Sequence, residues 1–264
     1  MRVSSVHVNC ETMHHSMVLL KSSCFLHRSP NNVKSKPFLG RGAYCSLRKQ
    51  ERRSLRKAWP SITVTLFGSG FFLGPLLDGL HSRVDLVVYD NGAIIIGPLH
   101  TNIWVPFLLG SFYCTIGLLQ LYLDERGSSK ISKDGIQKKA AVSLIALVVF
   151  IELSAEMYKA GVAYNTEAYI LFGLAELLWL SLDRTLLGFT LACIVGIGCP
   201  LAETPLMKLF HLWYYPQPNI NIFGQGLVSW TITCYFAYTI FLINFSRWLK
   251  SVLTAADQVN EGDS

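Results

Sequence analysis

Long apolar stretches separated by short polar segments dominate the chain from residue 59 onward. A helix needs about twenty predominantly apolar residues to cross a bilayer. Six stretches reach or approach that length, the fourth being the shortest, and they cover residues 59–80, 99–123, 140–158, 167–182, 186–207 and 226–249. The pattern predicts an all-α fold, a polytopic transmembrane bundle of about six helices.

Charge divides the chain into three regions. Residues 1–59 hold twelve Lys and Arg but only two acidic residues, whereas the other residues hold eleven Lys and Arg and fifteen acidic residues. We expect a basic, disordered extension over 1–58, a six-helix membrane domain over 59–250 and a polar C-terminal tail over 251–264. The Ser- and Arg-rich extension is typical of an organelle transit peptide, with a plastid favoured over a mitochondrion. The alternative is a cytosolic tail whose positive charge fixes the orientation of the first helix.

The connections between the apolar stretches alternate in positive charge. Residues 124–139 carry five Lys and Arg, Arg184 follows the fourth stretch, and Arg247 and Lys250 end the sixth. The opposite connections carry only Arg83, Lys159 and Lys208. Because Lys and Arg concentrate on the cytosolic side of membrane proteins, both termini are predicted to lie on that side, or on the stromal side of a plastid membrane.

The composition argues against several classes of protein. Charged residues make up 15% of the chain, compared with roughly a quarter in soluble domains. The net charge of +6 arises in the extension, so nucleic-acid binding is not expected. The seven cysteines form no C-x-x-C pair, and neither His-Glu-x-x-His nor Gly-x-Ser-x-Gly occurs. We therefore expect no enzyme activity, no metal site and no cofactor.

Ionisable residues inside the apolar stretches need a partner or a function, because burying a charge in a membrane is costly. Five acidic residues fall there, namely Glu152, Glu156, Glu176, Asp183 and Glu203. Lys159 can pair with Glu156, three residues before it. Glu176, Trp179 and Asp183 share one helix face, which could line a pocket for an amphipathic ligand or dock a partner helix. The alternative is local pairing alone, for example between Asp183 and Arg184.

Several short motifs resemble the insulin-induced gene (Insig) family. Ile103-Trp104-Val105-Pro106 resembles part of its second span, Ile151-x-x-Ser154-Ala155 its third-span motif, and Leu178 to Arg184 its Leu-Trp-Trp-Thr-Phe-Asp-Arg motif. A Gly-rich fifth stretch and an aromatic loop at 215–218 follow in the same order. The second Trp of the family's pair is Leu180 here, and the family's ligand-facing Gln falls near Thr166.

The resemblance implies a non-catalytic endoplasmic-reticulum protein that binds a sterol-like or other lipid within its helices and regulates a polytopic membrane partner. Carried over by motif, Trp179 would line the lipid pocket and Asp183 would support partner binding. The expected lipid-binding residues are Trp179, Glu176, Thr166 and Phe150, and the expected partner-binding residues are Asp183 and Arg184. The alternatives are a small transporter that uses intramembrane carboxylates and an assembly factor of an organelle membrane. The extension favours a plastid membrane, and the family favours the endoplasmic reticulum.

Overall fold

The computed structural model describes residues 41–127 and 135–262. The chain divides into two units, Met1–Tyr44 and Cys45–Ser264, and the second unit contains the structure discussed below. Most of the expected presequence lies outside the described residues. The first helix already begins at Arg41, inside the region expected to be the extension, and the last helix continues to Gly262.

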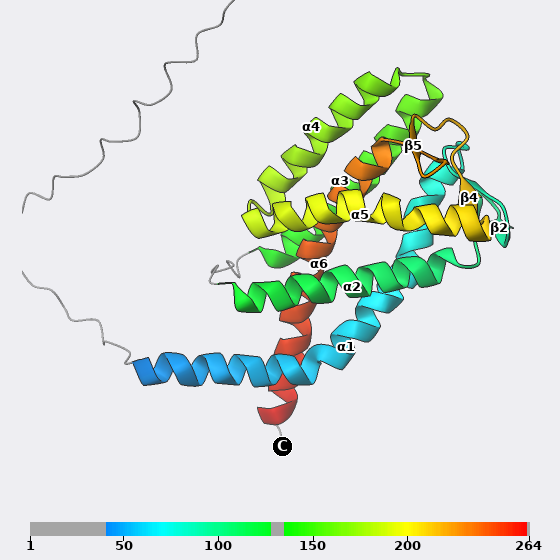
Figure 1. Cartoon of the computed structure of the whole chain (residues 1–264). Coiled ribbons are helices and arrows are strands. Elements are labelled where there is room, and N and C mark those ends of the chain that lie inside the picture. The colour runs from blue at the N-terminus through cyan, green and yellow to red at the C-terminus, as the bar shows by residue number, and fades with distance from the viewer. Residues whose placement is uncertain (1–40, 128–134, 263–264) are drawn as a thin grey trace, which may run out of the picture. The chain divides into compact units, whose positions relative to one another are not determined.

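The described residues form six helices (Figure 1), which confirms the helical membrane architecture predicted from the apolar pattern. They are α1 (Arg41–Ser82), α2 (Val105–Arg126), α3 (Ile136–Lys159), α4 (Tyr164–Leu182), α5 (Leu186–Phe210) and α6 (Trp230–Gly262). Within the described residues, four helices are long and apolar enough to cross a membrane: the Ala58–Ser82 part of α1, and α2, α3 and α5. The chain is therefore an integral membrane protein.

Helix α6 is the centre of the bundle. It packs against α2, α3, α4 and α5, and most of its residues from 236 to 244 are buried. Because protein rather than lipid surrounds α6, this helix can carry polar residues such as Thr239 and Asn244, both buried, at membrane depth. This position explains why α6 is less apolar than the four helices that qualify as membrane spans.

Small residues allow close approach between neighbouring helices, as expected from their frequency in the apolar stretches. A Cβ on Gly196 of α5 would lie 2.8 Å from the Ile232 carbonyl oxygen of α6, so glycine permits the two backbones to touch. Gly70 of α1 meets the backbone of Leu109 in α2 in the same way. By contrast, Gly68 and Gly198 have open space where a Cβ would lie. Close packing therefore uses only part of the glycine pattern.

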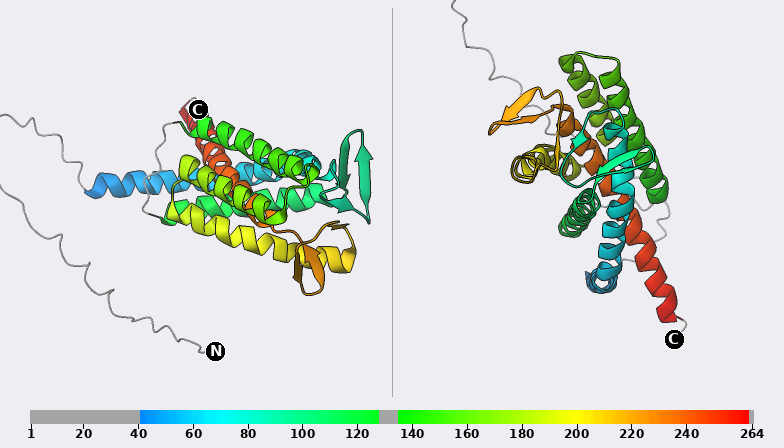
Figure 2. Two further views of the ribbon diagram at one scale, coloured as in Figure 1. Left: turned by 90° about the horizontal axis from the view of Figure 1, so that it is seen from above. Right: turned by 90° about the vertical axis from the view of Figure 1, so that its right-hand side faces the viewer.

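Three short antiparallel pairs of strands lie in the described connections between the helices. The apolar pattern did not predict these strands. The strands β1 (Val88–Tyr89) and β4 (Trp213–Tyr214) pair together, as do β2 (Ala93–Ile96) with β3 (Leu99–Asn102), and β5 (Ile220–Ile222) with β6 (Gln225–Leu227). Figure 2 shows that these strands lie at the end of the bundle opposite the C-terminus.

Two expected helix starts are therefore wrong. Residues 99–104 were expected to open the second span, but Leu99–Asn102 is strand β3 and the helix begins at Val105. Gly97 takes a left-handed φ of 59° and, with Pro98, turns the chain into a hairpin. Pro106 lies in the first turn of the helix, where proline is well tolerated. Likewise, residues 226–229 were expected in the sixth span but form part of β6 and the approach to Trp230. Apolar residues alone do not distinguish a short strand from the first turn of a helix.

Candidate lipid-binding cavity

A cavity of about 110 Å³ lies at the end of the bundle that carries the strands. It is surrounded by the last part of α1, the first turns of α2 and α6, and the second half of α5. Its lining combines aromatic, aliphatic and polar side chains: Asp78, His81, Val87, Tyr89, Val105, Leu108, Leu109, Ile151, Glu203, Trp213, Tyr215, Trp230, Thr231, Cys234, Tyr235 and Tyr238. An apolar cavity with a few convergent polar groups is the usual form of a small-molecule site.

Two carboxyl groups in this cavity are held by tyrosine hydroxyls. Glu203 of α5 is buried, and its Oε2 accepts a hydrogen bond of 2.6 Å from the Tyr215 hydroxyl. Tyr235 of α6 donates its hydroxyl to Oε1 of the same carboxyl. Asp78 of α1 accepts a hydrogen bond from the Tyr89 hydroxyl. The carboxyls are thus satisfied by neutral donors, and no Lys or Arg is among the described residues that line the cavity.

Burial keeps Tyr215 in its donating form. This tyrosine lies in the loop after β4, and its side chain is enclosed by the protein. Burial, followed by the adjacent Glu203 carboxyl, raises the pKa of the Tyr215 hydroxyl well above its ordinary value. The hydroxyl therefore remains protonated at physiological pH and can donate to Glu203.

His81 forms part of the cavity wall. Its Nε2 lies 2.7 Å from the Ser154 hydroxyl of α3, and its ring lies 4.4 Å from the Trp230 ring, centroid to centroid. Because the Ser154 hydroxyl donates its own proton to the Ile151 carbonyl, it can only accept from Nε2. His81 is therefore assigned the tautomer with the proton on Nε2, which fixes the ring between α3 and α6.

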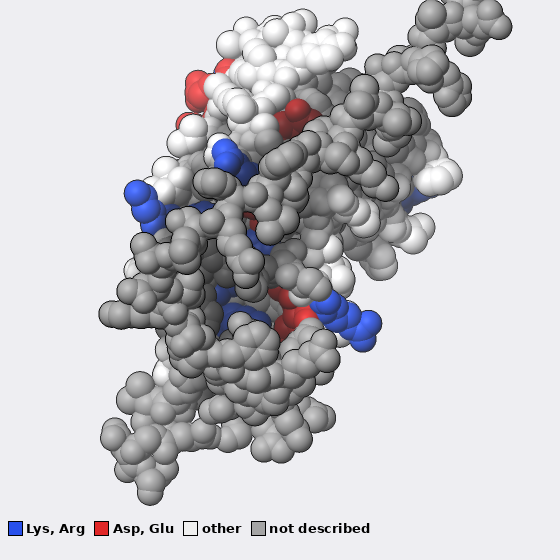
Figure 3. Space-filling model, turned by 90° about the vertical axis from the view of Figure 1, so that its left-hand side faces the viewer, with Lys and Arg blue, Asp and Glu red and all other residues white. Residues whose placement is uncertain are grey.

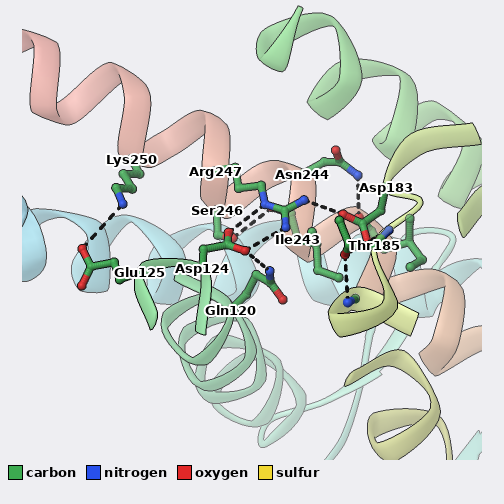
Figure 4. A network of polar contacts seen from close by, with 12 residues as sticks. Gln120, Asp124, Glu125, Asp183, Thr185, Ile243, Asn244, Ser246, Arg247 and Lys250 are labelled. Carbon is green, nitrogen blue, oxygen red and sulfur yellow. Dashed lines mark hydrogen bonds and ion pairs between the residues drawn. The ribbon is translucent and has the colours of Figure 1, made fainter. Parts of the chain in front are cut away.

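A second buried polar cluster lies on the other side of the bundle, at the C-terminal ends of α2 and α4 (Figure 4). The Arg247 guanidinium of α6 makes two hydrogen bonds to Asp124 of α2, of 2.8 and 2.9 Å, and one of 2.5 Å to Asp183. The three side chains are 10%, 8% and 0% exposed. One cation therefore ties three helices together at a site shielded from water.

Neighbouring polar groups complete this Arg247 cluster. Gln120 donates to Asp124 at 2.7 Å, and the Thr185 hydroxyl and backbone N–H both donate to Asp183. Thr185 also caps α5 by accepting from the Gly188 N–H at 3.0 Å. In the lower part of the space-filling view, some Lys and Arg atoms of the described residues lie beside Asp and Glu atoms (Figure 3). Asp183 thus links the end of α4 and the start of α5 to α6.

The structure brings only some of the predicted site residues together. Trp179 donates its indole N–H to the Thr185 carbonyl at 3.0 Å and packs on Phe189, next to the Arg247 cluster. Phe150 is buried in the core, and Glu176 is partly buried on α4. Thr166 is exposed at the start of α4, roughly 20 Å along the helix from Trp179 at 1.5 Å per residue. None of these four residues lines the cavity.

The predicted partner-binding residues take different positions. Asp183 does not pair with the adjacent Arg184 but with Arg247, and its side chain has no exposed surface. Arg184 is exposed, has a left-handed φ of 59° and donates to the Leu180 carbonyl. Of this pair, only Arg184 is directly accessible at the surface.

Of the acidic residues in the third span, Glu156 makes the local pair with Lys159 that the spacing predicted, whereas Glu152 pairs with a residue distant in the sequence. Lys159 contacts Glu156 at 2.8 Å. Arg83, which follows α1, contacts Glu152 and lies 3.8 Å from Glu156. The side chains of this Arg83 cluster are 37–52% exposed. The cluster is therefore an ion-pair group at the surface.

Most of the cavity residues were not predicted from the sequence. Glu203 was noted as an acidic residue in an apolar stretch but was not assigned to a site. Asp78 carried the same signal, an acidic residue within the first apolar stretch, and could have been found by it. The tyrosines had no comparable signal, because aromatic residues are common in any membrane helix.

No family model and no curated protein matches this chain. Solved structures do match its fold. The crystal structure of MvINS, a mycobacterial Insig homologue from Mycobacterium vanbaalenii, aligns with a TM-score of 0.57 at 17% identity, over 70% of this chain and 92% of that chain. The fold is Insig-like. A cross-linked trimer of an MvINS cysteine variant aligns with a TM-score of 0.58 at 18% identity, over 72% and 94% of the two chains.

The Insig-like fold agrees with the resemblance found in the sequence. At 17–18% identity, the similarity establishes the arrangement of the helices. The alignments include nearly all of MvINS and 70–72% of this chain, so this chain has residues with no counterpart in them.

Proposed function

We propose that this protein is a non-catalytic, Insig-like membrane protein that binds a lipid within its helical bundle and regulates a membrane partner. The cavity between α1, α2, α5 and α6 is the observation that carries the proposal. It gathers polar groups among aromatic and aliphatic side chains at the strand end of the bundle, where the polar head of a ligand could meet them.

The size of the cavity indicates how a lipid would bind. Its volume of about 110 Å³ is smaller than the roughly 300–1,000 Å³ of pockets that enclose a drug-sized ligand. It can therefore admit the polar head of a lipid, while the apolar part lies along the aliphatic side chains of α2. Sterol-like and other singly hydroxylated lipids have heads of suitable size.

The charge of the cavity favours an uncharged head. Asp78 and Glu203 both line it, and no Lys or Arg among its described lining residues could pair with a phosphate or carboxylate. A hydroxyl group instead could donate a hydrogen bond to Asp78, of which only one oxygen meets Tyr89. We therefore propose a neutral lipid with a hydroxylated head rather than an anionic phospholipid.

The face of α4 is the second proposed location for lipid and partner. The residues that the Insig resemblance favours for lipid contact remain Trp179, Glu176 and Thr166 of α4 and Phe150 of α3. Asp183 and Arg184 remain those favoured for partner contact. Because Asp183 is enclosed by the Arg247 cluster, its effect on a polytopic partner would be indirect, through the position of the turn between α4 and α5.

A photo-crosslinkable sterol tests the proposal in reconstituted protein. Cys234 lines the cavity, so Cys234→Leu should narrow it and reduce labelling several-fold. Cys193→Leu makes the same change in α5 at a partly buried position outside the cavity and should leave labelling unchanged. Loss of labelling in Trp179→Ala alone would move the site to α4. Absence of labelling in the unmodified protein by sterol and diglyceride probes would contradict lipid binding.

The transporter alternative receives less support from the contacts. It would use Glu152, Glu156 and Glu176. The first two are partly exposed and paired with Arg83 and Lys159. A carboxylate held by a cation is a poor proton carrier, because the pairing favours its ionised form. Flux into liposomes that is lost in Glu152→Gln would restore this alternative.

The compartment remains part of the proposal. The Ser- and Arg-rich N-terminal sequence favours a plastid membrane, whereas the Insig-like fold favours the endoplasmic reticulum. A C-terminal fluorescent fusion separates the two. A plastid signal would separate the protein from the endoplasmic-reticulum sterol pathway, and a reticular pattern would place it there.

A further inference from the structure

The hairpin formed by β2 and β3 exposes an apolar surface on both of its faces. Ile94, Ile95 and Ile96 are all exposed, Ile95 by 71% and Ile96 by 63%. Successive side chains of a strand point to opposite faces, so Ile95 and Ile96 project in opposite directions. Apolar side chains on both faces of β2 are thus left uncovered by the described part of the chain.

Hydrogen bonds hold the base of this hairpin, whereas the apolar side chains near its tip are exposed. Asn102, at the end of β3, is buried and donates to the carbonyls of Asn91 and Leu212 at 2.6 and 3.2 Å. Its Oδ1 accepts from the Trp104 N–H at 3.0 Å. The apolar tip therefore has a fixed position relative to α2.

The hairpin continues directly into the outer surface of a membrane-spanning helix. Ile103, Trp104 and Phe107, at the start of α2, are 49–55% exposed. No Asp, Glu, Lys or Arg occurs from residue 91 to residue 123, a range that includes the hairpin and nearly all of α2. Tryptophan at the end of a spanning helix is typical of the boundary between lipid and water. The strands also lie across the ends of the helices (Figure 2), at the end where Trp104 precedes α2.

We propose that the β2–β3 hairpin lies in the headgroup region of the membrane, with Ile95 and Ile96 both in contact with lipid. A protein partner on one face would leave the isoleucines of the other face exposed, whereas lipid surrounds both faces. The outer edges of a two-stranded hairpin carry unpaired N–H and C=O groups, which cannot be satisfied in the hydrocarbon core. The headgroup region supplies both apolar contact and water for these groups.

Spin labels test the position of the hairpin in phosphatidylcholine liposomes. Single cysteines replace Ile95, Ile96 or Ala160 in full-length protein whose seven native cysteines have been changed to alanine or serine. Ala160 is the matched control, because it is exposed at the end of α3 beside Lys159. The ratio of accessibility to oxygen over a water-soluble nickel chelate should be several-fold higher at residues 95 and 96 than at 160.

Two results would overturn the proposal. A ratio at residue 95 or 96 equal to that at 160 would place that face of the hairpin in water. Low accessibility to both reagents would show that protein covers the hairpin. All three positions are exposed, so the labelled variants should retain the unfolding temperature of the cysteine-free parent, which checks that the fold is intact.

Discussion

The two ends of the bundle hold their buried carboxyl groups in different ways. In the Arg247 cluster, Asp124 and Asp183 share one guanidinium and three helices are tied together. In the cavity, the carboxyls of Glu203 and Asp78 accept hydrogen bonds from tyrosine hydroxyls, and the described lining residues include no Lys or Arg. The Arg247 guanidinium, together with Gln120 and Thr185, occupies the acceptor sites of these two carboxylates of the Arg247 cluster. A carboxylate that is held by neutral donors still has acceptor capacity for a ligand.

The positions of the clusters strengthen this contrast. Leu109 lines the cavity and Asp124 belongs to the Arg247 cluster, and the two residues lie roughly 22 Å apart along α2 at 1.5 Å per residue. A change at one cluster therefore leaves the other intact. We infer that the Arg247 cluster stabilises the bundle and that the cavity serves binding.

The largest expected effect is that of Arg247→Met. Removal of the guanidinium leaves two buried carboxyls without a cation, which should lower the free energy of unfolding by about 3–5 kcal/mol. Chemical unfolding in detergent micelles measures the loss. Replacing Asp124 and Asp183 by asparagine in the same variant should recover part of it, because the uncompensated charges would be gone.

Lys250→Met is the matched control for Arg247. Lys250 lies on the same helix and pairs with Glu125 of α2 at 3.6 Å, but both side chains are about one-third exposed. The expected loss is below about 1 kcal/mol. Equal losses in the two variants would contradict the distinction between buried and exposed pairs at this end.

An intermediate effect is expected for Tyr215→Phe at the cavity. Glu203 would lose one of its two tyrosine donors, at a cost of about 1–3 kcal/mol in the free energy of unfolding. Tyr214→Phe is the control, because the neighbouring hydroxyl is on a side chain that is 47% exposed. Similar unfolding curves for the two variants would show that the bond to Glu203 contributes little.

The difference in the free energy of unfolding between wild type and Tyr215→Phe should change with pH in a defined direction. The pKa of Tyr215 is raised in the folded protein, so its protonated form is favoured by folding. Its contribution should be fully present below the ordinary tyrosine pKa of about 10 and should decline as the pH rises through the folded value. The difference between wild type and Tyr215→Phe should therefore be constant from neutral pH to about pH 9.

The smallest effect is expected for Arg83→Gln. Like Arg247, Arg83 faces two acidic residues, but its contacts with Glu152 and Glu156 are exposed. Water and salt screen such pairs, so the loss should be below about 1 kcal/mol and should diminish at high ionic strength. A loss comparable to that of Arg247→Met would mean that burial does not explain the contrast.

Much of the helical architecture could be predicted from the sequence. The apolar stretches predicted six helices, and the described residues form six, of which four are long and apolar enough to span the membrane. The spacing of Glu156 and Lys159 predicted their ion pair. Both features depend on neighbours along one helix. The sequence motifs also indicated the Insig-like fold that the comparison with MvINS supports.

Tertiary structure decided the partners of the polar residues. Asp183 could have paired with Arg184 beside it, but the crossing of α4 and α6 brings Arg247 to it from 64 positions along the chain. Glu203 meets Tyr215 and Tyr235 because the loop after β4 folds back over α5 and α6. The sequence by itself determined which segments are apolar enough to enter the membrane, since that depends on local composition. Which buried charges are neutralised, and which remain available to a ligand, depends on contacts between distant residues and was decided by packing alone.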